Sequence, residues 1–193
     1  MFRPICALIF KATGWKFKNE IPDELRSFVF IGAPHTANYD FIMAMAISYL
    51  MKRNARFVIK KEWLRFPLNL FFKPMGGIGV DRNVLKESKT TSHTDLMADL
   101  FKEHADLVVM IAPEGTRSPN KNWKTGFYYI AQKAKVPIVL GYANYKTKEA
   151  GMGLVIYPED FETDMIKIMN FYRHMEGKVP ENFQLDQRYL PKS

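Results

Sequence analysis

The sequence predicts an α/β fold with a mostly parallel central sheet, helices on both faces and a single domain spanning residues 1–193. Runs of Val, Ile, Leu and Phe without polar alternation recur along the chain, as is typical of strands buried on both faces of a sheet. Segments with helical periodicity separate these runs, which indicates parallel strands joined by helices. No repeat or Pro/Gly/Ser-rich linker divides the chain.

The expected elements follow one another as strand, loop and helix. The clearest strand is 107–111 (LVVMI), which is closed by Pro113. Ser92 and Asp95 form a capping-box pattern at the start of a helix, and Gly177 marks the end of the last helix. Strands are expected over 28–31, 56–59, 78–80, 107–111, 137–140 and 153–157, and helices over 40–52, 92–104, 126–135 and 163–176.

Residues 1–18 form a basic amphipathic segment, with four basic side chains before the first acidic residue, Glu20. Its apolar residues recur at helical spacing at Ile5, Leu8, Ile9 and Ala12. Such a helix is suited to the surface of an anionic lipid leaflet. The alternative is a helix that caps the core with its lysines in water, and the sequence leaves both open.

Composition narrows the classes of function. Lys and Arg outnumber Asp and Glu by 28 to 20, and this net charge of +8 favours an anionic partner such as nucleic acid, a membrane surface, a phosphorylated substrate or an acidic carrier protein. The single cysteine, Cys6, excludes an internal disulfide and predicts a reducing, cytosolic setting. The longest charge-free apolar run, 41–51, is far shorter than the ~20 residues of a membrane span, so neither a span nor an export signal is expected.

The loop after the first expected strand holds a histidine and an aspartate five residues apart, His35 and Asp40. On a continuous helix this offset places two side chains about 140° apart, so contact requires His35 in the loop and Asp40 in the first turn of the next helix. An aspartate bonded to one ring nitrogen leaves the other nitrogen free as a base. The alternative is a helix cap beside an ordinary surface histidine.

The loop after strand 107–111 combines a carboxylate, a glycine, a hydroxyl and a guanidinium: Glu114, Gly115, Thr116 and Arg117. Arginine presents a planar set of donors that suits phosphate oxygens, and glycine lets the backbone approach a ligand closely. The alternative is a polar turn in which Arg117 pairs with Glu114.

A third cationic loop follows the glycine-containing strand and ends at Arg82. Because Arg82 takes the place of the last glycine of GxGxxG, this loop is not a dinucleotide site. The sequence has no GxxxxGK[ST], no GxSxG and no His/Cys cluster with zinc spacing, so neither a cofactor nor a metal ion is expected.

Four blocks therefore occur in order: an HxxxxD box at 35–40, a block ending in arginine at 77–82, the letters EGTRS at 114–118, and a proline-containing block at 136–139. Together they resemble the PlsC-like glycerolipid acyltransferases, the 1-acyl-glycerol-3-phosphate acyltransferase family. The resemblance covers about Ser27 to Tyr145, and the ordered set is more specific than any single block. Pro34 replaces the Asn often seen before the histidine, and the family's strong N-terminal transmembrane stretch is missing.

The resemblance implies transfer of a fatty acyl group from acyl-CoA or acyl-carrier protein to the hydroxyl of a lysophospholipid such as 1-acyl-glycerol-3-phosphate, in phospholipid biosynthesis. The acceptor attacks directly, so no Ser or Cys nucleophile is needed. The implied roles are His35 as base, Asp40 as its orienting partner, Arg82 and Arg117 as phosphate ligands, and Glu114, Gly115 and Thr116 as substrate-binding residues.

An aromatic and basic stretch lies between two of these loops and includes Trp63, Phe66 and Phe71. These side chains are expected to line an acyl groove or to enter the lipid interface, and the alternative is an ordinary amphipathic helix packed on the core. Met43, Met45 and Met51 are expected to fill the core rather than to line a channel.

The sequence leaves three other functions open. One is a non-catalytic lipid-binding protein on the same fold, which would bind lipid without turning over a thioester. An acyltransferase of the same superfamily that uses a lyso-ornithine or another non-phosphate acceptor would employ the same His–Asp pair. A nucleic-acid-binding domain is disfavoured, because basic residues are dispersed among acidic ones and no helix-turn-helix, RRM or KH pattern occurs. The expected location is the cytoplasm, with peripheral association at the inner face of the cell membrane.

Overall fold

The structure is a computed structural model that describes residues 2–80 and 92–190, and its central feature is a seven-stranded sheet. The strand order is β1-β7-β6-β2-β5-β3-β4, and every neighbouring pair is parallel except β6 and β7. The strands are β1 (Lys16–Asn19), β2 (Phe28–Ala33), β3 (Asn54–Lys60), β4 (Gly77–Val80), β5 (Leu107–Ile111), β6 (Ile138–Asn144) and β7 (Glu149–Ile156). The predicted mostly parallel sheet is confirmed.

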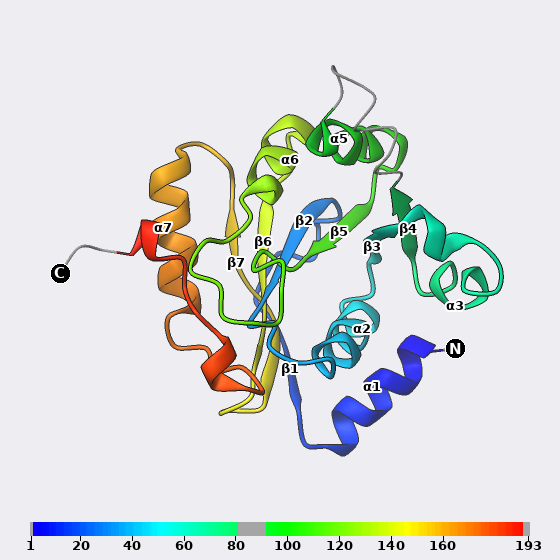
Figure 1. Cartoon of the computed structure of the whole chain (residues 1–193), viewed down its shortest axis with the longest axis horizontal. Coiled ribbons are helices and arrows are strands. Elements are labelled where there is room, and N and C mark those ends of the chain that lie inside the picture. Colours follow the sequence, from blue (N-terminus) through cyan, green and yellow to red (C-terminus); the bar gives the residue numbers. More distant parts are fainter. Residues whose placement is uncertain (1, 81–91, 191–193) are drawn as a thin grey trace.

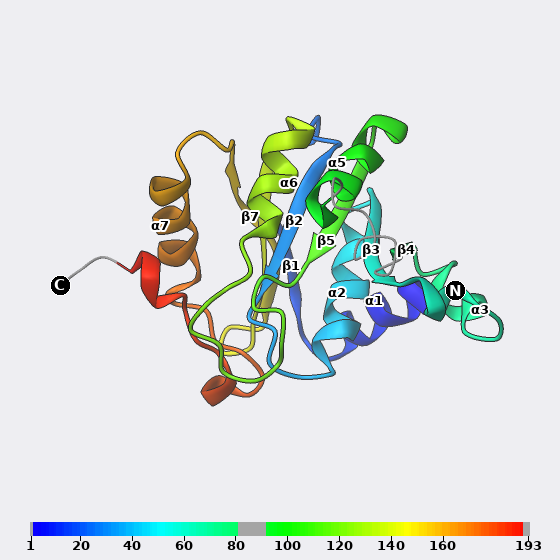
Figure 2. The same cartoon turned by 45° about the horizontal axis from the view of Figure 1, so that its top comes forward.

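Helices cover both faces of the sheet, as predicted (Figures 1 and 2). The helices are α1 (Phe2–Ala12), α2 (Asp40–Leu50), α3 (Asn69–Phe72), α5 (His93–Glu103), α6 (Gly126–Ala134) and α7 (Phe161–Tyr172). One face is packed by α5, α6 and α7, and the other by α1 and α2.

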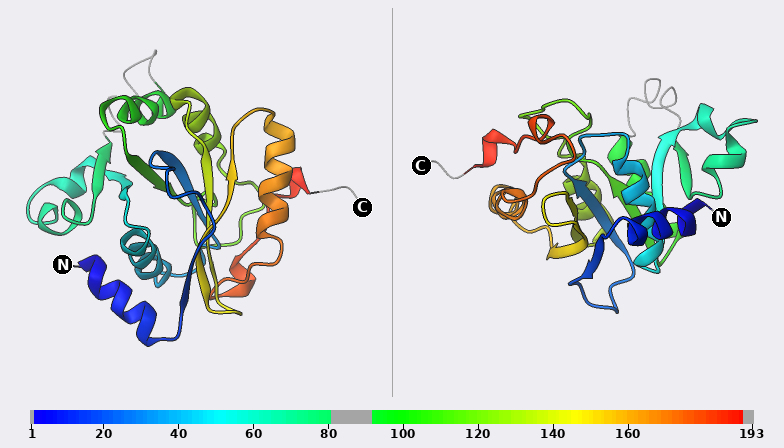
Figure 3. Two further views of the ribbon diagram at one scale, coloured as in Figure 1. Left: turned by 180° about the vertical axis from the view of Figure 1, so that it is seen from behind. Right: turned by 90° about the horizontal axis from the view of Figure 1, so that it is seen from below.

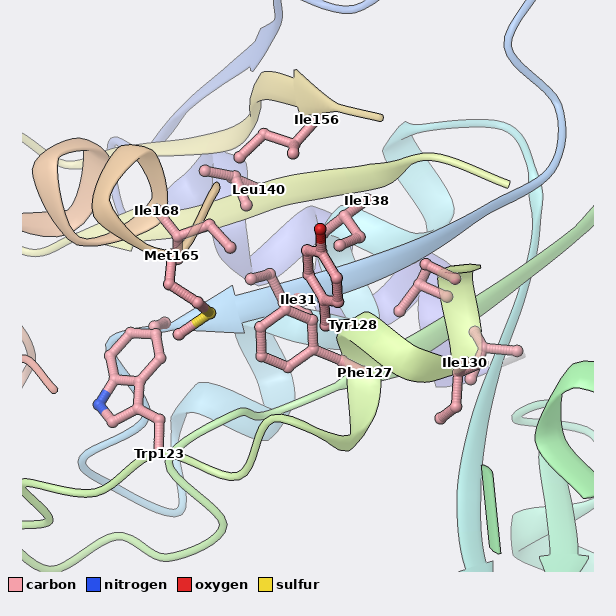
Figure 4. Packing of buried hydrophobic residues seen from close by; sticks show 14 of the residues in the cluster. Ile31, Trp123, Phe127, Tyr128, Ile130, Ile138, Leu140, Ile156, Met165 and Ile168 are labelled. Atoms are coloured by element: carbon pink, nitrogen blue, oxygen red, sulfur yellow. The ribbon is translucent and has the colours of Figure 1, made fainter. Parts of the chain in front are cut away.

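The central strand β2 explains why the apolar runs lack polar alternation. Val29 and Ile31 join the core under α6 and α7, whereas Phe28 and Phe30 join the core under α1 and α2. Figure 4 shows Ile31 beside Phe127 of α6 in the first of these cores. A strand buried on both faces needs apolar residues at every position, and this gives β2 its continuous run.

Most predicted elements are confirmed, and the differences lie at their ends. Strand 107–111 is as predicted, and the side chain of Ser92 forms a capping box with Asp95 at the start of α5. Helix α7 begins earlier than predicted because Asp160 accepts a hydrogen bond from the N–H of Thr163. The strands β6 and β7 are longer than predicted, since their antiparallel pairing continues to Asn144 and Glu149.

The N-terminal segment forms the predicted helix but buries a different face. Cys6, Ala7 and Phe10 enter the core, whereas Ile5 and Leu8 of the predicted apolar stripe are 51% and 68% exposed. The helix therefore caps the core and also leaves apolar side chains in water. The strand β1, which follows it, was not predicted.

The aromatic stretch does not form an amphipathic core helix, so that alternative is wrong. It contains the 3-10 helix η1 (Lys61–Leu64) and the single turn α3, and within both elements no residue is buried. Across residues 2–80 and 92–190, no helix has the length and hydropathy that crossing a bilayer requires.

Candidate active site

Two loops at one edge of the sheet carry most of the predicted site residues. The first joins β2 to α2, and the second joins β5 to α6. Because β2 and β5 are parallel neighbours, both loops leave the sheet at the carboxyl ends of the strands, where open α/β sheets bind ligands.

His35 lies in the first loop and Asp40 in the first turn of α2, the arrangement that contact between them requires. The Nδ1 atom of His35 is 3.6 Å from Oδ2 of Asp40. The same oxygen accepts hydrogen bonds from the backbone N–H groups of Thr36 (2.6 Å) and Ala37 (2.8 Å), so the carboxylate is fixed against the loop. The geometry directs Nδ1 to Asp40 and leaves Nε2 available as a base.

Tyr145 holds the second oxygen of Asp40, and sequence reasoning missed it. Its hydroxyl donates to Oδ1 of Asp40 over 2.6 Å from a position just after β6. Burial and this hydrogen bond raise the pKa of Tyr145 well above its usual range, so the hydroxyl stays protonated and donates. The ring of Trp15 packs edge-on against Tyr145 at 4.8 Å. No local pattern signals this partner, because it lies 105 residues from Asp40.

Glu114 connects the two loops. Its carboxyl oxygens accept the backbone N–H of His35 at 3.0 and 3.1 Å, and the residue is only 3% exposed. Burial raises the pKa of Glu114 to about 8. The carboxyl group of Glu114 thus bonds to the backbone of the first loop, whereas the sequence predicted that it positions the acceptor. The alternative prediction, an ion pair between Glu114 and Arg117, does not occur among the described residues either.

The four residues that follow Glu114 in the second loop, 115–118, are exposed. Gly115 has a φ of +69°, a conformation that side-chain-bearing residues rarely adopt. The hydroxyl of Thr116 accepts a hydrogen bond from the N–H of Ser118 at 3.2 Å, which forms a local turn. Arg117 is exposed, and its positive charge helps to lower the pKa of His35.

Burial is the main cause of the low pKa of His35. Arg117 lowers this pKa further, while Asp40 raises it, and the net direction is below the usual value of 6.5. The imidazole is therefore neutral under physiological conditions and able to accept a proton.

An apolar pocket of about 160 Å³ lies beside His35 and Asp40, between α2 and the sheet. Its lining includes Phe30, Met43 and Met45. Both methionines are buried in the core, as predicted, and they also form the pocket wall, which was not predicted. The pocket lining does not include the exposed side chains of the aromatic stretch at Trp63, Phe66 and Phe71, and Arg82 lies outside the described residues.

An imidazole in contact with a buried carboxylate, beside an apolar pocket and near a guanidinium, fits the class of enzymes that activate an acceptor group by general-base chemistry. The comparison with protein families is consistent with this class. The family model Acyltransferase matches residues 17–142, so the chain belongs to the acyltransferase family of the PlsC type, and it is an acyltransferase enzyme. A search of curated proteins finds no match.

Proposed function

We propose that this enzyme transfers a fatty acyl group from a thioester, acyl-CoA or acyl-carrier protein, to the hydroxyl of a lysophospholipid such as 1-acyl-glycerol-3-phosphate. The reaction would serve phospholipid biosynthesis at the inner face of the cell membrane, with the protein bound peripherally. The observation that carries the proposal is the contact between His35 and Asp40 beside an apolar pocket.

In the proposed reaction, Nε2 of His35 takes the proton of the acceptor hydroxyl while the hydroxyl oxygen attacks the carbonyl carbon of the thioester. Asp40 stabilises the imidazolium that forms. The tetrahedral intermediate then expels the thiolate, which recovers the proton from His35. General base catalysis of this kind contributes about 10²–10⁴-fold to the rate.

Arg117, together with Arg82, would hold the phosphate of the acceptor through charged hydrogen bonds. The exposure of Arg117 and its electrostatic effect on His35 support this role, since the acceptor phosphate must lie near its reacting hydroxyl. Gly115 and Thr116 would face the glycerol part of the acceptor. We assign Glu114 an indirect role, because its carboxyl group holds the backbone of His35.

The acyl chain of the thioester would occupy the apolar pocket. Its position beside His35 supports this assignment, since the chain must lie next to the carbonyl under attack. Gly141 forms part of the wall, and a Cβ atom there would lie 1.8 Å from Cζ of Phe30. A side chain at residue 141 would therefore force the ring of Phe30, which also lines the pocket, to move.

The direct test measures acyl transfer by the purified full-length chain from labelled acyl-CoA and acyl-carrier protein to a panel of lyso-lipids. We expect lysophosphatidate to be acylated and His35→Ala to lose about 10²–10⁴-fold in kcat. His104→Ala is the matched control, because His104 is an exposed histidine at the end of α5. Near wild-type turnover by a folded His35→Ala protein would refute the mechanism, and preferential acylation of lyso-ornithine lipid would refute the phosphate acceptor.

A further inference from the structure

Exposed apolar side chains gather in two segments, 2–12 and 61–75. Thirteen large apolar residues are exposed in the described part of the chain, and eight of them belong to these segments. We call these eight residues the apolar end: Phe2, Ile5, Leu8, Trp63, Phe66, Leu68, Leu70 and Phe71. A concentration of this kind on one part of a protein marks an interaction site.

The two segments lie side by side although about fifty residues separate them in sequence. The guanidinium of Arg3 in α1 donates to the carbonyl oxygens of Ala55 and Met75, both at 2.6 Å, and so ties α1 to the residues that follow α3. All views place α3 and the start of α1 at the same end of the molecule, far from the C-terminus (Figures 1, 2 and 3). The apolar end is therefore one surface built from two segments.

The charge of this surface favours an anionic partner. The two segments contain five basic residues and one acidic residue, Glu62. The side chains of Lys11, Arg65 and Lys73 are exposed among the apolar ones. In a two-fold dimer the same patch meets its own copy, so these cations would face one another. Apolar side chains mixed with cations instead suit an anionic lipid leaflet.

We propose that the apolar end is the surface by which the protein docks on an anionic lipid leaflet. The inference rests on the proposed function in one respect, namely that the acceptor is a membrane lipid. Trp63 and the phenylalanines enter the interface, while the exposed side chains of Lys11, Arg65 and Lys73 contact the lipid headgroups.

The apolar end also adjoins the pocket of the active site. The ring of Phe2 lies 6.1 Å from that of Phe41, which lies 6.0 Å from that of Phe57. Phe41 and Phe57 line the pocket, whereas Phe2 is exposed. The ring of Phe41 thus connects the exposed Phe2 of the apolar end to the lining of the pocket.

The test measures co-sedimentation of the full-length protein with vesicles of phosphatidylglycerol and phosphatidylethanolamine, and with vesicles of phosphatidylcholine alone. The test variant is Phe66→Glu/Phe71→Glu, whose parent side chains are 80% and 65% exposed and so can change without disturbing the core. The matched control is Leu154→Glu/Tyr157→Glu, at residues 40% and 63% exposed in and just after β7. Phe66→Ala/Phe71→Ala repeats the test without added charge.

We expect the wild type and the control to bind anionic vesicles alike, and the test variant to partition at least about tenfold more weakly. Binding should weaken as salt is raised and on phosphatidylcholine. Equal binding by the test variant, or equal loss in the control, would overturn the proposal. So would a wild-type dimer that the test variant converts to a monomer with vesicle binding unchanged. Because binding is measured without turnover, a failure of acyl transfer to all lyso-lipids is a separate result that bears on the proposed function alone.

Discussion

The first loop of the candidate active site and residues 115–118 of the second differ in how firmly the protein holds them. In the first, Thr36 and Asp40 are buried, and the loop is bonded to partners from distant parts of the chain, among them Glu114 and Tyr145. In the second, residues 115–118 are all exposed, with a local bond between Thr116 and Ser118. The backbone and the carboxylate of the first loop are therefore fixed from several sides, whereas residues 115–118 face the solvent.

This contrast makes a kinetic prediction. Changes that remove a hydrogen bond from the first loop should lower kcat, because they disturb the base in the transition state. Changes to the side chains of the second loop should raise KM for the acceptor, because they remove binding. Three variants, Arg117→Ala, Tyr145→Phe and Glu114→Gln, test whether the effects on kcat and on KM separate in this way.

Arg117→Ala should have the largest effect of the three. We expect KM for a phosphorylated acceptor to rise about 10–100-fold, the loss typical of hydrogen bonds to a charged group. KM for the thioester should stay near the wild-type value. Because Arg117 helps to lower the pKa of His35, the acidic limb of kcat/KM should also move to higher pH.

The measurement for Arg117→Ala is steady-state kinetics over a range of pH values. Arg26→Ala is the control, because Arg26 is an exposed arginine just before β2. It therefore lies at the amino end of this strand, whereas the candidate site lies at the carboxyl end. A large fall in kcat with an unchanged acceptor KM would contradict the division between the loops.

Tyr145→Phe should lower kcat by about fivefold to tenfold, because a buried carboxylate oxygen loses its donor. Without this donor, the charge of Asp40 acts more strongly on His35, so the acidic limb of kcat should shift to higher pH. A purely structural role would not move the pH profile. Tyr157→Phe, at an exposed tyrosine, is the control, and an unchanged profile in Tyr145→Phe would remove the residue from the site.

The central sheet was predictable because its strands are buried on both faces. The apolar runs of β2 and β5 follow directly from that environment. The edge strand β1 was not predictable. Its four residues, KFKN, are mostly polar and exposed, and they are held in the sheet by backbone pairing with β7. Its position depends on β7, more than a hundred residues further along the chain.

Within the site, the residues close in sequence were predictable and the distant ones were not. His35 and Asp40 lie on one crossover, so their contact follows from a strand end and a helix start. Tyr145 reaches Asp40 only because β6 pairs with β2, and sequence periodicity does not specify which strands become neighbours. The same reason hides the second function of Met43 and Met45, which line a pocket only once α2 packs on the sheet.

Glu114→Gln should have the smallest effect on activity and a clear effect on stability. The amide oxygen of glutamine still accepts the N–H of His35, so kcat should stay within about twofold of the wild type. The pKa of Glu114 is about 8 in the folded protein and near 4.5 in an unfolded chain. Because folding raises the pKa of Glu114, the protonated carboxyl group stabilises the folded protein fully below pH 4.5. This stabilisation is lost as the pH rises through the folded-state pKa of about 8. Between pH 4.5 and about 8, the free energy of unfolding should therefore fall less steeply with rising pH in Glu114→Gln than in the wild type.

Urea unfolding at several pH values measures the difference between Glu114→Gln and the wild type. Glu181→Gln, at an exposed glutamate, should leave the wild-type pH dependence intact. If Glu114 instead bound the acceptor directly, Glu114→Gln would raise the acceptor KM as Arg117→Ala does. Parallel pH dependence in the variant and the wild type would show that the carboxyl group is ionised in the folded protein. The combination of an unchanged KM and a flattened pH dependence would show that the side chain of Glu114 holds the first loop rather than binds the acceptor.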